Sequence, residues 1–164
     1  HFDVKRAATM GIPPGPVYGK LKRGEVVTLA DGRKVNGADL CGPTIIGRKL
    51  AYCTDTVFCE SAIELAEQAD VLIHEATFSH QDADLAYQRM HSTSTMAAQV
   101  ALAAQAKQLI MTHFSPRYAP GNALQLSDLL DEAQAIFPNT LMAKDFFTYD
   151  INRKGEKTKA PVAV

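Results

Sequence analysis

The sequence is short of cysteine and has no long apolar run, and both shortages limit what the protein can be. Its three cysteines are Cys41, Cys53 and Cys59, which is an odd number with no Cys-x-x-Cys spacing. Neither a disulfide framework nor a zinc–thiolate site is therefore indicated, which is typical of a reducing compartment. No apolar run is long enough to span a bilayer. We expect a cytoplasmic protein with no membrane partner.

Net charge is also nearly absent, at −1 over 164 residues, so no overall field points to nucleic acid. The charges are nevertheless unevenly distributed. Residues 1–25 carry five basic side chains against two acidic ones, whereas residues 55–91 carry eight acidic side chains against one arginine. A basic segment beside an acidic, metal-capable centre suits a metal-dependent enzyme with an anionic substrate. Two solvated surfaces of opposite sign would give the same pattern.

Three short apolar runs each end on a residue that can bind a metal or carry a proton. Residues 49–54 lead into Asp55, residues 70–73 into His74 and Glu75, and residues 108–112 into His113. Such runs, separated by helical stretches, predict buried strands of an α/β sheet. Because functional sites collect at strand ends in these sheets, Asp55, Glu75 and His113 could share one cleft.

The other elements follow from capping, periodicity and turn signals. Helices are predicted over residues 60–68, 82–90, 96–106 and 124–137, and further strands over 140–143 and 146–151. Asp31-Gly32 between two short β-type runs predicts a hairpin. Residues 12–19 hold three prolines and two glycines, so we expect a stiff, exposed arm with no helix. Residues 152–164 are expected to form a polar tail.

The residue types at these positions suit a metal site that acts on an anionic substrate. Carboxylates and imidazoles bind divalent metals, and a carboxylate such as Asp55 can bridge two of them. His91 precedes a predicted helix and could act as a general acid, while Arg117 could hold phosphate. Each residue also has an ordinary structural interpretation: a turn aspartate, a satisfied His–Glu pair, a surface histidine or a solvated arginine.

Four segments in order resemble the ribonuclease Z family of the metallo-β-lactamase fold, and the resemblance runs from about Phe2 to Ile151. They are Gly11-Ile-Pro-Pro-Gly-Pro-Val-Tyr-Gly-Lys-Leu-Lys-Arg-Gly-Glu25, His74-Glu-Ala-Thr-Phe78, His91-Ser-Thr-Ser94 and Thr112-His-Phe-Ser-Pro-Arg-Tyr118. The resemblance implies tRNA 3′-end processing by a homodimer that uses two Zn²⁺ ions, or Mn²⁺ or another divalent metal. Precursor tRNA would be the substrate.

The resemblance also implies a role for each candidate residue. Asp55 would bridge the two metals and His113 would be a terminal ligand. His91 would assist the leaving group, with Glu75 as a supporting or proton-relay carboxylate, and Arg117 would contact phosphate. Lys20, Lys22 and Arg23 would belong to an exosite arm that grips tRNA, and a stiff basic arm suits a phosphate backbone.

The family's His-x-His-x-Asp-His motif does not occur in this sequence. We therefore expect the C-terminal half of an αββα sandwich, with part of the exosite arm at its N-terminus and further sequence upstream of His1. The expected division is a partial arm over 1–25, the metallo-β-lactamase-like half over 26–151 and the tail over 152–164. The chain alone should bind zinc weakly and not cleave RNA. A phosphodiesterase of another substrate, or a non-catalytic tRNA-binding or dimerisation module, are the alternatives.

Overall fold

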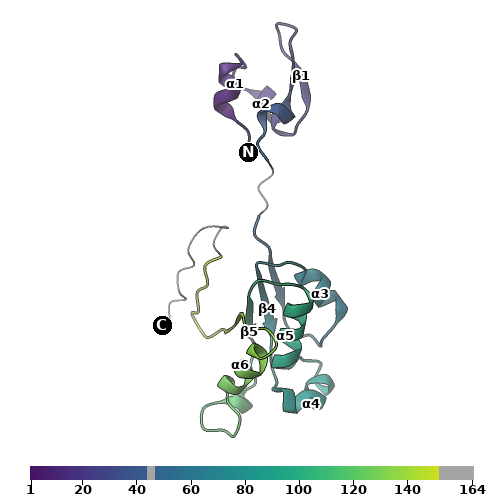
Figure 1. Cartoon of the computed structure of the whole chain (residues 1–164), viewed down its shortest axis with the longest axis vertical. Coiled ribbons are helices and arrows are strands. Elements are labelled where there is room, and N and C mark those ends of the chain that lie inside the picture. The colour runs from purple at the N-terminus through teal and green to yellow at the C-terminus, as the bar shows by residue number, and fades with distance from the viewer. Residues whose placement is uncertain (44–46, 152–164) are drawn as a thin grey trace. The chain divides into compact units, whose positions relative to one another are not determined.

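The computed structural model describes residues 1–43 and 47–151, and the predicted tail over 152–164 lies outside the described residues. The chain forms two compact units, one from His1 to Gly47 and one from Arg48 onward. Figure 1 shows both units, and each is described by itself below. Within the described residues, no helix has the length and apolar character needed to cross a membrane.

The first unit packs short elements around a small apolar core. It contains α1 (Val4–Thr9), α2 (Pro16–Lys22), β1 (Val26–Thr28), β2 (Lys34–Asn36) and the 3₁₀ turn η1 (Gly37–Leu40). The predicted hairpin is confirmed, because β1 and β2 pair antiparallel. The buried core side chains come from both helices, β2, η1 and the segments beside α1: Phe2, Ala7, Ile12, Leu21, Val35 and Leu40. The compact unit therefore extends beyond residue 25, where the sequence analysis ended the arm.

The expectation that residues 12–19 contain no helix is wrong, whereas residues 13–16 are exposed as expected. Pro16 occupies the first turn of α2, and Gly15 is its N-cap. A proline is well tolerated there because the first helical N–H groups have no partner within the helix. Ile12 is buried, and its carbonyl accepts a 2.9 Å hydrogen bond from the Tyr18 hydroxyl. The two ends of the proline-rich segment are thus held to the unit, while residues 13–16 between them are exposed.

The second unit is built on a parallel sheet of four strands in the order β3 (Leu50–Cys53), β4 (Val71–Glu75), β5 (Leu109–Thr112) and β6 (Thr140–Met142). Between them lie α3 (Glu60–Ala66), α4 (Ala83–Gln88), α5 (Ser94–Ala103) and α6 (Leu126–Gln134). The turns η2 (His80–Asp82) and η3 (Pro116–Tyr118) complete the unit. The predicted α/β class is confirmed by this strand–helix alternation.

The strand predicted over residues 146–151 is wrong, since none of these described residues lies in a strand. Phe146 has a φ of 63° and is 89% exposed. This left-handed backbone breaks an extended run, and no described strand pairs with the segment. A β-type composition alone therefore does not make a strand without a partner.

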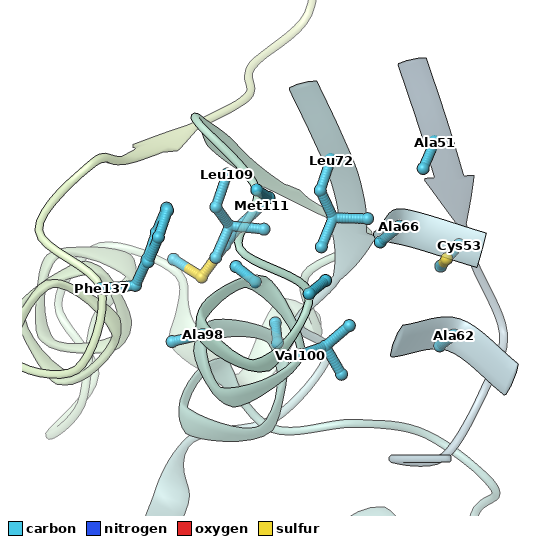
Figure 2. Close-up of a cluster of buried hydrophobic side chains, with 14 of the residues drawn as sticks. Ala51, Cys53, Ala62, Ala66, Leu72, Ala98, Val100, Leu109, Met111 and Phe137 are labelled. Atoms are coloured by element: carbon cyan, nitrogen blue, oxygen red, sulfur yellow. The ribbon is translucent and has the colours of Figure 1, made fainter. Parts of the chain in front are cut away.

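One face of the sheet packs on the helices and forms the main core. Figure 2 shows Leu72, Leu109 and Met111 reaching from the strands toward α5, which presents Ala98 and Val100. The alanine content of α5 lets the helix backbone approach the sheet closely. Thr93 caps α5 by accepting a hydrogen bond from the Met96 N–H. This packing fixes the carboxyl ends of the strands, where the candidate residues lie.

Candidate metal centre

The turns that follow β3 and β5 carry the two residues expected to bind metal. Asp55 follows β3 by two residues, and His113 follows β5 directly. The strands are in register, with Cys53 beside His74 and His74 beside Met111, so their ends lie along one edge. Asp55 and His113 both have left-handed backbones, with φ values of 48° and 61°. Such conformations cost about 1–2 kcal/mol in a non-glycine residue, so the surrounding turns must hold them.

These turns bring three potential ligands together. Asp55, His91 and His113 each offer one atom, and the three atoms lie within 4.8 Å of one another. Nε2 of His113 is 3.2 Å from Oδ1 of Asp55, and the side chains are 45% and 66% exposed, respectively. One carboxylate and two imidazoles fit zinc or another divalent cation, and three protein donors leave a coordination position for water or substrate. The donor set therefore fits a divalent metal.

A buried carboxylate underlies this cluster. Glu75 is fully buried at the end of β4, and its Oε1 accepts hydrogen bonds from His91 Nδ1 at 2.9 Å and the Thr56 N–H at 2.8 Å. Its Oε2 accepts from the Thr77 hydroxyl at 2.5 Å. Burial by itself would raise the pKa of Glu75, but hydrogen bonds from Thr77, His91 and the Ser92 and Thr56 N–H groups together hold that pKa below its usual value. Glu75 is consequently ionised at neutral pH.

The ionised carboxylate sets the orientation of His91. A carboxylate only accepts hydrogen bonds, so the contact at Nδ1 requires a hydrogen on that nitrogen. The ring also lies against His113, with 5.3 Å between the ring centroids. His91 is partly buried between these neighbours, and its Nε2 is left for the cluster or for a substrate.

Arg117 lies on η3, four residues beyond His113. Its guanidinium packs over the Phe78 ring, 5.5 Å from the centroid, and lies 3.6 Å from Asp82. The side chain is 47% exposed, so donors remain available to an anion. Asp82 also accepts a 2.5 Å hydrogen bond from the Tyr118 hydroxyl, which stiffens this turn.

The three basic residues expected in the arm lie at the C-terminal end of α2, within the first unit. Lys20 and Lys22 are exposed on α2, and Arg23 is its C-cap. Arg23 pairs with Glu25 at 2.7 Å, while the Lys22 ammonium lies 5.8 Å from the centroid of the Phe2 ring. These residues make the C-terminal end of α2 basic. The exposed ion pair between Arg23 and Glu25 contributes little to stability.

Comparison with known proteins assigns the chain to a superfamily. A model of the beta-lactamase superfamily domain matches residues 14–114. The chain belongs to this superfamily. It is 71% identical over 158 residues to ribonuclease Z of Rippkaea orientalis, which covers 96% of the chain and 50% of that protein. It is 72% identical over 153 residues to ribonuclease Z of Crocosphaera subtropica, covering 93% and 49%. The chain thus spans about half the length of the curated relatives it matches.

A solved structure agrees with the superfamily. The metallo-beta-lactamase fold protein YhfI from Bacillus subtilis aligns with a TM-score of 0.51 at 27% identity, over 58% of this chain and 36% of that chain. The metallo-β-lactamase fold expected from the sequence is confirmed, and so is the resemblance to ribonuclease Z.

The structure brings together more residues at the site than the sequence predicts. Asp55 and His113 do meet, and Glu75 lies next to His91. His91, expected only as a proton donor, also lies within ligand distance of the other two. The sequence motif around Thr77 does not indicate a role for this residue, although its hydroxyl contacts both Glu75 and His113. Its position at the end of a strand that carries Glu75 was the signal that could have indicated it.

Proposed function

We propose that this chain is the C-terminal half of a metal-dependent endoribonuclease that removes 3′ trailers from precursor tRNA. The reaction is hydrolysis of one phosphodiester bond, which leaves a 3′-hydroxyl on the tRNA. One observation carries the proposal: a chain 71% identical to a ribonuclease Z gathers Asp55, His91 and His113 at one edge of its sheet. This donor set suits metal-assisted phosphodiester hydrolysis.

Each residue has a role that its contacts support. Asp55 and His113 would hold the metal, Zn²⁺ or Mn²⁺, and the two carboxylate oxygens of Asp55 would allow it to serve two ions. A divalent cation supplies Lewis-acid chemistry at such a centre, polarising phosphate and acidifying water. His91, hydrogen-bonded to the Glu75 carboxylate, gives a proton to the departing oxygen. Arg117 donates to a phosphate oxygen near the scissile bond and stabilises the developing charge.

The first unit contributes substrate binding in this proposal. Lys20, Lys22 and Arg23 contact the phosphate backbone of tRNA, so recognition depends on RNA shape more than on base sequence. We further propose that the intact protein is a cytoplasmic homodimer. The chain alone, with only Asp55 and His113 assigned as metal ligands, should bind Zn²⁺ weakly and leave RNA uncut.

The test is cleavage of a 3′-extended precursor tRNA with Zn²⁺ or Mn²⁺ and a chelator control. Two proteins are compared, the 164-residue chain and a chimera that joins it to the other half of the Rippkaea orientalis relative. The chimera should cleave and the chain alone should not. His113→Ala should abolish cleavage, whereas His80→Ala should retain it, because His80 is exposed and its ring contacts only Thr95 among the described hydrogen bonds.

The other outcomes separate the alternatives. A chimera that binds tRNA but never cuts it would indicate a binding or dimerisation module. Equal activity on structured tRNA and on a small phosphodiester would favour a phosphodiesterase of another substrate. Tight binding of two Zn²⁺ ions by the 164-residue chain alone would contradict the proposed weakness of its isolated centre.

A further inference from the structure

A single hydroxyl connects the buried carboxylate to the candidate ligand His113. Thr77 is buried just beyond β4, and its Oγ1 lies 2.5 Å from Oε2 of Glu75. The same oxygen lies 2.9 Å from Nδ1 of His113 and 2.9 Å from the His113 carbonyl oxygen. A hydroxyl has one hydrogen to donate and two lone pairs to accept with. The direction of each hydrogen bond can therefore be worked out.

The hydroxyl hydrogen of Thr77 points to Glu75. A distance of 2.5 Å is typical of a hydroxyl donating to an ionised carboxylate. Without that hydrogen between them, two oxygen lone pairs would meet at this distance inside the protein, which is strongly unfavourable. The carbonyl oxygen of His113 cannot donate, so it can at most share the same hydrogen.

The lone pairs of Thr77 Oγ1 then face Nδ1 of His113. A 2.9 Å contact between them is a hydrogen bond only if Nδ1 carries the hydrogen. The opposite arrangement would have Thr77 donate to Nδ1 and leave Nε2–H to donate to Asp55. That arrangement places an unshared pair of Thr77 against the buried Glu75 carboxylate at 2.5 Å. It is disfavoured because the opposed pair of the other tautomer, Nε2 and Asp55, is longer at 3.2 Å and open to solvent.

We propose that Thr77 is a positioning residue that holds neutral His113 in the Nδ1–H tautomer through Glu75. The lone pair of Nε2 is then directed at Asp55 Oδ1, 3.2 Å away, and the two acceptors face one another. A cation between them relieves this opposition. Metal-binding histidines commonly donate their second ring N–H to such a supporting group. The assignment of the tautomer is argued from hydrogen bonds alone. Only the inference that this tautomer favours metal binding depends on the proposed function.

Glu75 consequently orients two histidines with its two oxygens. Oε1 accepts from His91 directly, and Oε2 acts on His113 through Thr77. Serine could replace Thr77 in this relay because it keeps the hydroxyl. Valine could not, although it keeps the shape of threonine.

The test reads the imidazole nitrogens of the 164-residue chain directly. Long-range ¹H–¹⁵N NMR at pH 8.5 distinguishes the two tautomers by nitrogen chemical shift, and His113→Ala assigns the signals. We expect Nδ1–H in the wild type and in Thr77→Ser, and a shift toward Nε2–H in Thr77→Val. Thr140→Val is the matched control. Thr140 is also a buried threonine, but it is far from Thr77 in the sequence and its hydroxyl donates to the nearby Phe137 carbonyl.

Metal affinity gives a second measurement. Calorimetric titration with Zn²⁺ should show affinity reduced about tenfold or more in Thr77→Val, within about threefold of wild type in Thr77→Ser, and unchanged in Thr140→Val. A wild-type His113 in the Nε2–H tautomer, or an unaltered tautomer in Thr77→Val, overturns the proposal. If Thr77→Val does not fold, the wild-type tautomer still decides. If NMR finds the expected tautomers but the titration finds no Zn²⁺ binding, the hydrogen-bond relay is supported and only the proposed metal centre is contradicted.

Discussion

Gly37 begins η1 where this turn passes against the end of α2, and the approach leaves no space for a side chain. A Cβ built on Gly37 would lie 2.2 Å from the Leu21 carbonyl oxygen and 2.8 Å from two further backbone atoms of Leu21. Real Cβ atoms stay about 3 Å or more from such neighbours, so Gly37→Ala must separate the two segments by roughly 1 Å. Overpacking of this kind typically costs about 1–3 kcal/mol. Because backbone lies on both sides of the clash, we expect the upper end, about 3 kcal/mol.

This cost is large for so small a unit. At about 0.05–0.15 kcal/mol per residue, a unit the size of the first one has a stability of roughly 2–7 kcal/mol. Gly19→Ala is the matched control in the same unit. Gly19 lies inside α2, and the nearest atom to an added Cβ is the flexible end of Arg23 at 3.8 Å. Alanine is the better helix former, so this change should stabilise α2 by up to about 1 kcal/mol.

Amide hydrogen exchange of the 164-residue chain measures both variants residue by residue. Gly37→Ala should speed exchange in α2 roughly a hundredfold, since each 1.4 kcal/mol corresponds to a factor of ten. Gly19→Ala should slow it, and amides of β4 and β5 should change in neither variant. The reasoning fails if Gly37→Ala leaves exchange in α2 within threefold of wild type, or if it loosens β5 equally.

Three further outcomes follow from burial and hydrogen bonding in the second unit. Burial holds the pKa of His74 below its ordinary 6.5, so the unfolded chain takes up a proton before the folded chain does, and stability falls as pH drops below about 6.5. Urea unfolding midpoints, followed by circular dichroism from pH 8 to 5, measure this fall. A midpoint that does not change with pH would contradict it. The pKa of the Cys59 thiol is lowered by hydrogen bonds led by a serine hydroxyl, whereas burial raises that of Cys53, so mass spectrometry should find Cys59 alkylated well before Cys53. Leu109→Ala removes a fully buried core side chain and should cost about 3–5 kcal/mol by urea unfolding, while Leu102→Ala, which is exposed, should cost under about 0.5 kcal/mol.

The second unit was predictable because its strands are continuous apolar runs bounded by turn signals. The same rule placed Asp55, Glu75 and His113 at one edge, since parallel strands end together. The rule failed over residues 146–151, where a β-type composition has no partner strand to pair with. It failed again at Pro16, because counting prolines ignores that the first turn of a helix accepts one. Pairing and position, which are not properties of composition, decided both cases.

The roles inside the site were harder to predict than their placement. Asp55 and His113 are widely separated in sequence, and β4 lies between the strands that precede them. Strand order places them at one edge of the sheet, and the turns after β3 and β5 bring them into contact. The hydrogen bonds of Thr77 depend on side-chain directions in three different turns, and no periodicity encodes these directions. The motif around Glu75 therefore identified the position of the network without identifying its connections.

The turns that carry the candidate ligands are held by hydrogen bonds from within the second unit. The carbonyl of Thr56, next to Asp55, accepts from the Ser92 hydroxyl at 2.7 Å, and the Thr56 N–H donates to Glu75. Together these bonds restrain a turn with a left-handed backbone at Asp55. Without them the turn would relax and release the roughly 1–2 kcal/mol that this conformation costs. On the other side of Glu75, the relay reaches His113. The geometry of both ligands is thus supported by residues already in this chain.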